Sequence, residues 1–331
     1  MTPTRRQLLT ASVAMSALTV AGCSHGTSAG TSTSTAPTTS PPGRTPAPRK
    51  TPTIAHDPLT GGKRTRNPVI AVKLENTAAA MPQYGLSDAD LVFAEVVEGN
   101  LTRLMPIFQT SFPTRIEPVR SARSTDIELL PMFGKPLLVY SGVAPQIRPK
   151  LERASIVLDS HGIRDPSRVA PHDLYFDLAT IARQKGLART RDIGLRFDAA
   201  SSAIRGADSA PKFSVPLGGD RFSFVYDEKH YVPSWNGLVY ADAGADGKQV
   251  TTENVLVLRV REVSDGYRDP ADNPVYRSVT TGSGALTLYR NGTRLSGTWH
   301  RAADNAPFRL LKSDGTQLLL TPGKTWILLQ T

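Results

Sequence analysis

The amino-acid sequence predicts a mixed α/β protein, in which an N-terminal α/β domain with a central sheet is followed by a mostly antiparallel β domain. Short β-branched apolar runs bounded by Gly and Pro occur throughout. Helical patterns alternate with these runs only before about residue 206, and later runs follow one another without helices. Because 26 Gly and 26 Pro accompany 39% hydrophobic residues, the composition excludes a helical bundle.

The first predicted domain, residues 57–206, alternates strands and helices. Thr125 followed by Glu128 has the spacing of a helix capping box. Helical patterning also covers residues 145–153 and 177–185. Such alternation is typical of an α/β domain. The predicted strands are 69–74, 91–97, 101–108 and 137–140.

The second predicted domain, residues 207–331, contains strand patterns without helical ones. Asn291-Gly292 and Asp314-Gly315 each lie between two apolar runs and are strong hairpin signals. We therefore expect an antiparallel β domain of about 120 residues. Its predicted strands are 222–226, 231–235, 255–263, 285–289, 295–299, 308–311 and 326–329.

The distribution of charge argues against nucleic acid as a partner. The net charge of +10 is concentrated in residues 1–66, which carry eight Lys or Arg and a single acid, Asp57. The other residues carry 31 basic and 28 acidic side chains, a balance too even to attract a phosphate backbone. No glycine-rich phosphate loop occurs. We expect no nucleic-acid partner.

Residues 1–22 have the pattern of a bacterial export signal peptide. Arg5-Arg6 precede an apolar stretch over residues 8–21, which is about half the length that a membrane-spanning helix needs. The two arginines resemble the twin-arginine (Tat) signal. A general secretory signal that contains Arg-Arg is the alternative. Either signal predicts an extracytoplasmic protein.

Val20-Ala21-Gly22-Cys23 resembles the bacterial lipobox, in which the cysteine receives a diacylglyceryl group and fatty acids such as palmitate. Cys23 is the single cysteine of the chain, so no intrachain disulfide can form. The sequence predicts a lipoprotein held by Cys23 on the extracytoplasmic face of the bacterial cell membrane. Residues 23–56 are rich in Ser, Thr and Pro, which predicts a disordered tether.

Several segments of the folded part resemble one bacterial family, the YerB-like lipoproteins, described as domain of unknown function 3048 with N- and C-terminal subdomains. The resemblance covers nearly all of residues 58–331. It implies the two-part fold and a lipoprotein, and it implies no reaction. Three positions depart from the family pattern, with Met81, Asn100 and Glu117 where arginine, glycine and glycine are usual. The segments are PQYGLSDAD (82–90), EVVEGNLTR (95–103), RIEPVRSAR (115–123), APHDLY (170–175), GTW (297–299) and PGKTWI (322–327).

A cluster of arginines is the candidate ligand-binding site. Arg120 and Arg123 flank Ser121 just before a predicted helix, and guanidinium groups beside a hydroxyl and a helix start suit phosphates and carboxylates. We expect an anionic cell-envelope ligand, either a wall polymer or a lipid head group. The alternative is that the arginines pair with Glu95, Glu98, Glu117 and Asp126 to hold loops. The predicted ligand-binding residues are Asn76, Arg103, Arg115, Arg120, Ser121 and Arg123.

Glu98 and His172 are the candidate catalytic residues. Glu98 follows a predicted strand, as Glu75 and Asn76 follow another, and the carboxyl ends of parallel strands meet at the edge where α/β sheets bind ligands. A hydrolase or transferase of envelope polymers that uses both residues is therefore the alternative function. A structural carboxylate is the other interpretation of Glu98. The histidines lack metal-ligand spacing, so we expect no metal and no cofactor.

The lipobox leads to a direct prediction. Replacing Cys23 with Ala removes the acceptor thiol, so the variant should lose acylation and accumulate as unprocessed precursor. Detergent-phase partitioning and the size of the product measure both effects, with Ser24→Ala as the matched control. If Cys23→Ala still partitions into detergent at the mature size, the predicted lipid anchor is wrong.

Overall fold

A computed structural model describes residues 56–198 and 207–331. The predicted signal peptide, Cys23 and the tether up to residue 55 lie outside the described residues. The undescribed segment 199–206 ends where the domain boundary was placed, so that boundary stays a prediction.

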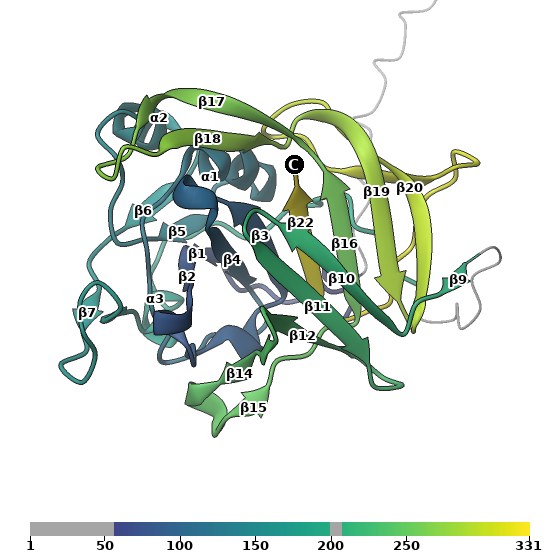
Figure 1. The fold of residues 1–331 in the computed structure, drawn as a ribbon, viewed down its shortest axis with the longest axis horizontal. Helices are drawn as coiled ribbons and strands as arrows, with labels where there is room; N and C mark the ends of the chain where they lie inside the picture. Colours follow the sequence, from purple (N-terminus) through teal and green to yellow (C-terminus); the bar gives the residue numbers. More distant parts are fainter. Residues whose placement is uncertain (1–55, 199–206) are drawn as a thin grey trace, which may run out of the picture. The chain divides into compact units, whose positions relative to one another are not determined.

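The first half of the described chain consists of short strands and short helices (Figure 1). The strands predicted over 91–97, 101–108 and 137–140 are confirmed to within one residue at each end. The strand predicted over 69–74 divides into two at Lys73, whose N–H donates to the carbonyl of Val139 at 3.0 Å. The strands are β1 (Ile70–Val72), β2 (Leu74–Asn76), β3 (Leu91–Val96), β4 (Thr102–Phe108), β5 (Leu137–Val139), β6 (Val157–Asp159), β7 (Ile163–Arg164) and β8 (Leu174–Tyr175).

The helix predicted after Thr125 exists, but its cap differs from the prediction. The carboxylate of Asp126 accepts a hydrogen bond from the backbone N–H of Arg123 at 2.7 Å. Thr125 and Glu128 instead accept hydrogen bonds from the backbone N–H groups of Ser278 and Thr280, because a distant strand packs on this helix. The helices are α1 (Ser124–Leu129), α2 (Arg148–Arg153) and α3 (Leu178–Ile181), with 3-10 turns η1 (Ala78–Ala80), η2 (Leu86–Asp88), η3 (Glu98–Asn100), η4 (Leu130–Phe133) and η5 (Ala243–Ala245).

The second half is built from strands, as predicted. The predicted strand 255–263 forms two strands, β16 and β17, that belong to different sheets. The strands are β9 (Asp208–Ser209), β10 (Lys212–Leu217), β11 (Asp220–Tyr226), β12 (Tyr231–Trp235), β13 (Leu238–Val239), β14 (Ala241–Asp242), β15 (Lys248–Gln249), β16 (Asn254–Arg259), β17 (Arg261–Arg268), β18 (Pro274–Val279), β19 (Gly282–Arg290), β20 (Thr293–Arg301), β21 (Arg309–Lys312) and β22 (Thr325–Gln330).

Within the described residues, one mixed sheet of twelve strands takes strands from both halves (Figure 1). Its order is β21-β20-β19-β16-β22-β3-β4-β1-β5-β6, with β2 on β4 and β9 on β20. Strand β22 runs parallel to both β16 and β3 and so joins the two halves. Strands β1 and β3 both run antiparallel to β4, so their carboxyl ends lie at the same edge. The mixed α/β fold with a mostly antiparallel second half is confirmed.

Of the two predicted hairpin turns, Asn291-Gly292 connects two strands, whereas Asp314-Gly315 leads only to an isolated bridge. Asn291 and Gly292 have φ of 49° and 69° and link β19 to β20, as a type I′ hairpin turn requires. After β21, the chain reverses at Asp314-Gly315, and Leu311 then bridges Gln317. A further Asn-Gly pair at 236–237 links β12 to β13 with the same geometry.

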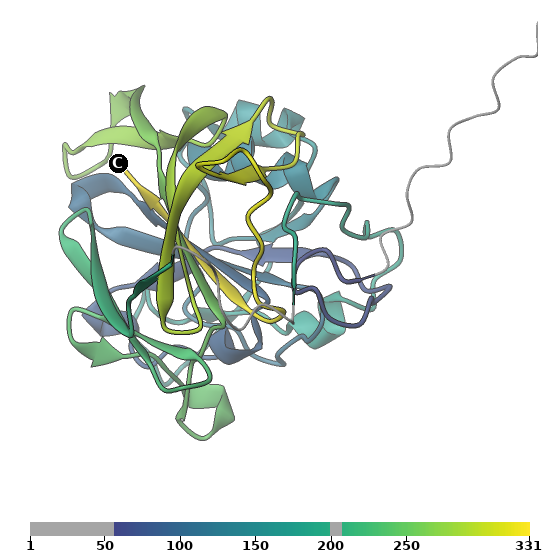
Figure 2. The ribbon, with the colours of Figure 1, turned by 90° about the vertical axis from the view of Figure 1, so that its right-hand side faces the viewer.

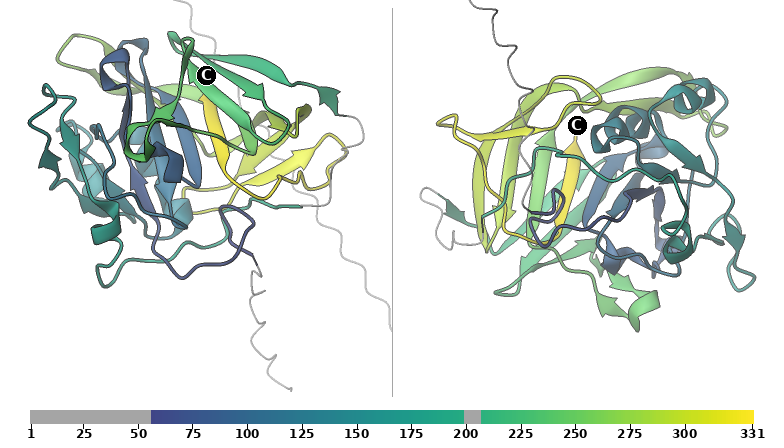
Figure 3. Two further views of the ribbon diagram at one scale, coloured as in Figure 1. Left: turned by 90° about the horizontal axis from the view of Figure 1, so that it is seen from below. Right: turned by 180° about the vertical axis from the view of Figure 1, so that it is seen from behind.

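The two faces of the sheet pack against different layers (Figure 2 and Figure 3). Successive side chains of a strand point to opposite faces, and β22 follows this rule. Ile327 belongs to the apolar cluster that includes Leu129 and Phe133, next to α1 and η4. Trp326 belongs to the opposite cluster, and its ring lies 5.9 Å from that of Phe224 in the small sheet β10-β11-β12-β13. Both faces of β22 are therefore buried.

No helix among the described residues is long and apolar enough to cross a membrane. The helices α1 and α2 each have six residues.

The position of β22 generates a prediction for folding. Deleting residues 325–331 removes a strand that is buried on both faces and paired on both edges, so cooperative urea unfolding, followed by circular dichroism, should be lost. Deleting Thr331 alone is the control, because this exposed residue follows the strand. A cooperative transition at the original urea midpoint in the longer deletion would contradict the central role of β22.

Candidate functional site

The carboxyl ends of β2 and β3 bring most of the predicted site residues together. Glu75 and Asn76 end β2, and Glu98 lies in the turn directly after β3. On the neighbouring strand β4, Arg103 is in register with both Glu75 and Glu95. The segment that carries Arg120 lies at the same edge, because the backbone N–H of Arg120 donates to the carbonyl of Lys73 at 2.8 Å. Residues far apart in the sequence thus share one edge of the sheet.

A buried lysine, Lys73, connects this edge of the sheet to α1. Lys73 has no exposed side-chain surface and forms ion pairs with Glu95 and, at 2.7 Å, with Asp126. Burial lowers the pKa of Lys73, and the negative charge of Asp126 opposes that shift. Because Asp126 also caps α1, this one side chain ties β1, β3 and α1 together. A lysine within an apolar strand run is a sequence signal for such a buried charge.

Arg123 is bound within the protein. Its Nε and Nη2 both lie 2.8 Å from the same carboxylate oxygen of Glu98, and its Nη1 donates to the carbonyls of Ser121 and Ala122. The side chains of Arg123 and Glu98 are 19% and 11% exposed. This arginine therefore holds the turn after β3 against the start of α1.

Arg115 also has internal partners. Its guanidinium pairs with Glu117 at 2.5 Å and with Asp165, and it lies over the rings of Tyr84 and Tyr175. Burial raises the pKa of Glu117, although Arg115 acts in the opposite direction. These contacts join the segments that carry Tyr84, Arg115 and Asp165. The role of Arg115 is therefore structural.

Two of the predicted ligand-binding residues lie inside the protein. Asn76 is fully buried, and its amide bonds Thr102 and the hydroxyl of Tyr240, each at 2.7 Å. Arg103 is 5% exposed and donates to the carbonyl of Thr102, and burial lowers its pKa to about 10. A ligand at the surface of this edge would not touch either side chain.

Arg120 is the most weakly engaged of the four predicted arginines. Its Nη1 donates to the carbonyl of Pro171 at 3.0 Å, and its Nε lies 3.9 Å from a carboxylate oxygen of Glu75. Its Nη2 has no partner among the described residues. The neighbouring hydroxyl of Ser121 lies 3.4 Å from that of Ser141. Arg120 and Ser121 thus retain donors that a ligand could use.

The structure gives Glu98 and His172 different partners. The imidazole Nδ1 of His172 lies 2.7 Å from a carboxylate oxygen of Glu75, whereas Glu98 pairs with Arg123. His172 therefore fixes the loop after Pro171 to the end of β2. The two candidate catalytic residues do not form a hydrogen-bonded couple with each other in the described structure.

A pocket of about 480 Å³, here called the edge pocket, opens beside Glu98, Ser121 and Arg123. The hairpin β17–β18 forms its other wall, and Figure 1 shows this hairpin crossing over α1. The hydroxyl of Tyr267 on this wall is buried and has no partner among the described residues. Burial raises the pKa of Tyr267. The other residues that line the pocket are Val143, Ala144, Pro145, Gln146, Arg268, Asp269 and Pro270.

The hairpin wall could not be placed from the sequence. Residues 264–270 lack an apolar alternation, because this hairpin pairs with no other strand and little of it is buried. Pro270 and Asn273 indicate a turn, but nothing in the sequence indicates which surface the turn covers.

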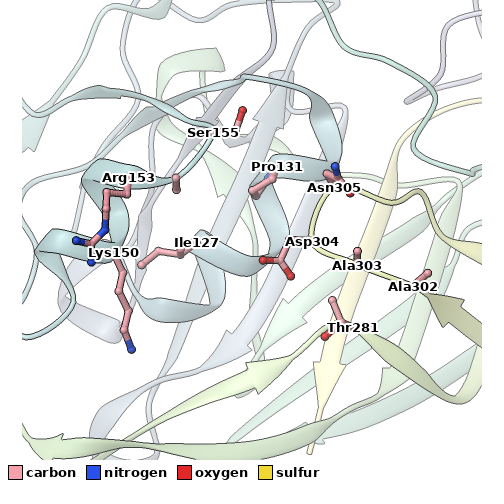
Figure 4. Close-up of a pocket in the computed structure, with 11 residues that line it drawn as sticks. Ile127, Pro131, Lys150, Arg153, Ser155, Thr281, Ala302, Ala303, Asp304 and Asn305 are labelled. Atoms are coloured by element: carbon pink, nitrogen blue, oxygen red, sulfur yellow. The ribbon is translucent and has the colours of Figure 1, made fainter.

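A larger pocket of about 720 Å³ lies on another side of α1 (Figure 4). Figure 4 shows Asp304 pointing toward α1 from a loop, with Lys150 and Arg153 on α2 at the far side. Burial raises the pKa of Asp304. None of the site residues predicted from the sequence lines this pocket. The described residues contain no group of three or more His, Cys, Asp or Glu side chains that could hold a metal ion.

The fold is that of a two-part protein whose halves share one sheet through β22. The chain belongs to the DUF3048 family. Residues 58–191 match the model described as "Protein of unknown function (DUF3048) N-terminal domain", and residues 213–327 match that of the DUF3048 C-terminal domain. The resemblance found in the sequence is therefore confirmed.

A curated relative and a solved structure agree with this assignment. The chain is 30% identical over 294 residues to "Putative lipoprotein YerB" of Bacillus subtilis (strain 168), covering 82% of this chain and 84% of the relative. The crystal structure of the YerB protein from Bacillus subtilis superimposes with a TM-score of 0.67 at 25% identity. That match covers 83% of this chain and 96% of the other.

The contacts of the two arginines generate a prediction for stability. Arg123→Ala leaves the largely buried carboxylate of Glu98 without its partner and should lower the free energy of unfolding by roughly 2 kcal/mol or more. Arg120→Ala removes a more exposed side chain with weaker contacts and should cost less than about 1 kcal/mol. Urea unfolding of both variants measures the difference. An equal loss of unfolding free energy in both variants would show that the contacts of Arg123 stabilise the fold no more than those of Arg120.

Proposed function

We propose that this chain is a lipid-anchored lipoprotein on the extracytoplasmic face of the bacterial membrane, and that its folded unit binds an anionic cell-envelope ligand. The export signal and the lipobox around Cys23 support the anchor. The name of the Bacillus subtilis relative, "Putative lipoprotein YerB", also supports it.

The location of the edge pocket is the observation that carries the binding proposal. Three residues singled out from the sequence, Glu98, Ser121 and Arg123, line this one pocket. The pocket lies beside Glu98, in the turn that follows β3. Its volume of about 480 Å³ is in the range of small-molecule sites.

The charges around the pocket indicate which group a ligand would present. Glu98 neutralises Arg123 through two short contacts to one oxygen, so Arg123 contributes little net attraction. Arg120 precedes Ser121 and does not itself line the pocket; it keeps free donors, and its Nε lies 3.9 Å from a carboxylate oxygen of Glu75. A phosphate or carboxylate would bind at Ser121, at the rim of the pocket, and at the neighbouring Arg120 outside it. An uncharged part would enter the pocket and lie against residues 143–146.

The contacts of Glu98 and His172 favour binding over catalysis. A hydrolase or transferase would need both groups at one reacting bond. Glu98 is instead held by Arg123 and His172 by Glu75, and each contact fixes a loop. Binding requires no change in these partners.

A thermal-shift measurement tests the proposal on the mature chain. The probes are a peptidoglycan fragment with free stem-peptide carboxylates and a short poly(glycerol phosphate). We expect at least one probe to raise the melting temperature of the wild type, and Arg120→Ala and Ser121→Ala to abolish that rise with little change in buffer alone. Arg309→Ala, which removes an exposed arginine of β21, is the charge-matched control.

Two outcomes would contradict the proposed binding site. The first is that neither probe raises the melting temperature of the wild type. The second is that Arg120→Ala and Ser121→Ala respond to the probes as Arg309→Ala does.

A further inference from the structure

A further pocket lies beside Pro58, close to the start of the described structure, and we call it the tether-side pocket. Its volume is about 350 Å³. Pro58 lines it, two residues after His56, the first residue of the described structure. The lining residues are Pro58, Arg64, Thr65, Arg66, Gln109, Arg189 and Thr190. None of them was singled out from the sequence, and none belongs to the edge pocket.

Hydrogen bonds and a β-bridge hold three segments of this pocket together. The side-chain amide of Asn67 donates to the carbonyl of Gln109 at 2.9 Å. The N–H of Val69 donates to the carbonyl of Ala188 at 3.2 Å, and Pro68 bridges to Arg189. These contacts hold the backbone of residues 67–69 next to Gln109 and Arg189.

The pocket concentrates positive charge. Arg64, Arg66 and Arg189 are exposed and line the same hollow, and no carboxylate lines it. Arg66 and Arg189 form no ion pair within the described part of the chain. This differs from the edge pocket, where Arg123 has a carboxylate partner. Asp90, which accepts a hydrogen bond from the N–H of Gln109, is buried and does not line the tether-side pocket. Exposed like charges around one concavity attract an anion.

Neutral groups complete the lining. Gln109 is 1% exposed, and its Oε1 is buried with no partner among the described residues. Rotation of its side-chain amide by half a turn presents the NH₂ group as a donor instead. The hydroxyl of Thr65 accepts from the N–H of Asn67 and keeps its own proton to donate. Two guanidinium groups with hydroxyl and amide donors match the oxygens of a phosphate.

We propose that the tether-side pocket binds a phosphate ester, either in the head group of an anionic phospholipid or in a soluble phosphate ester. The lipid source rests on the proposed anchor at Cys23. A tether of about 33 residues spans about 30 Å as a coil, which keeps this face close to the bilayer. A cationic patch beside a lipid anchor provides a second membrane contact. Binding at this pocket does not depend on the edge pocket.

Vesicle co-sedimentation tests the lipid source. The protein is the mature chain from residue 23 with Cys23→Ala, so that neither an acyl chain nor the signal segment contributes. We expect binding to vesicles of equal parts phosphatidylglycerol and phosphatidylcholine and not to pure phosphatidylcholine. Each arginine near an anionic surface contributes about fivefold in affinity, so the double variant Arg66→Ala and Arg189→Ala should bind roughly thirtyfold more weakly.

A matched control separates this pocket from general surface charge. The double variant Arg183→Ala and Arg309→Ala removes the same charge from exposed positions elsewhere. A thermal-shift titration with glycerol 3-phosphate tests the soluble source with the same variants. Stabilisation that the pocket variant loses and the control keeps, without vesicle binding, supports the soluble source.

Two outcomes would overturn the proposal. The first is that the control variant loses as much binding as the pocket variant. The second is that the wild type responds neither to phosphatidylglycerol vesicles nor to glycerol 3-phosphate. Melting temperatures in buffer alone check that both double variants are folded, because all four arginines are exposed and their removal should cost little stability.

Discussion

The parallel pairing of β22 with both β16 and β3 is the constraint on which the described fold depends. Thr325 is in register with Asn254 on one side and with Leu91 on the other. Its strand contributes Trp326 to one apolar cluster and Ile327 to the other. The two parts of the family are matched as separate segments, yet their sheets become one sheet through this strand. The hairpin wall of the edge pocket reaches the first half because β22 fixes the halves together.

Much of the fold could be predicted from the sequence because its strands are short, β-branched and bounded by turn residues. The type I′ turn at Asn291-Gly292 is a local property and needs no tertiary information. The cap of α1 depends on distant contacts. Thr125 and Glu128 have capping-box spacing, but their side chains accept hydrogen bonds from the backbone of Ser278 and Thr280 instead. Asp126 caps the helix in their place. Local spacing alone does not reveal such competition.

The candidate site was predictable in its position and less so in its chemistry. The ends of predicted strands placed Glu98 near Asn76, and the structure has both at one edge of the sheet. The partner of each arginine follows from tertiary structure, so the sequence could not show that Glu98 holds Arg123 while Arg120 keeps free donors. The tether-side pocket escaped detection for a similar reason. Arg189 lies far from Arg66 in the sequence, and the contacts of Pro68 and Val69 with Arg189 and Ala188 bring the two together.

The sheet order also determines how this protein must reach its native state. Leu91 and Thr325 pair directly, so the long chain segment between them has to close into a loop before β22 can pair with β3 and β16. Folds dominated by such distant pairings fold slowly. Until β22 docks, two apolar strand edges stay open, and open edges are templates for association with other chains. The interval before that docking step is when this chain is most exposed to aggregation.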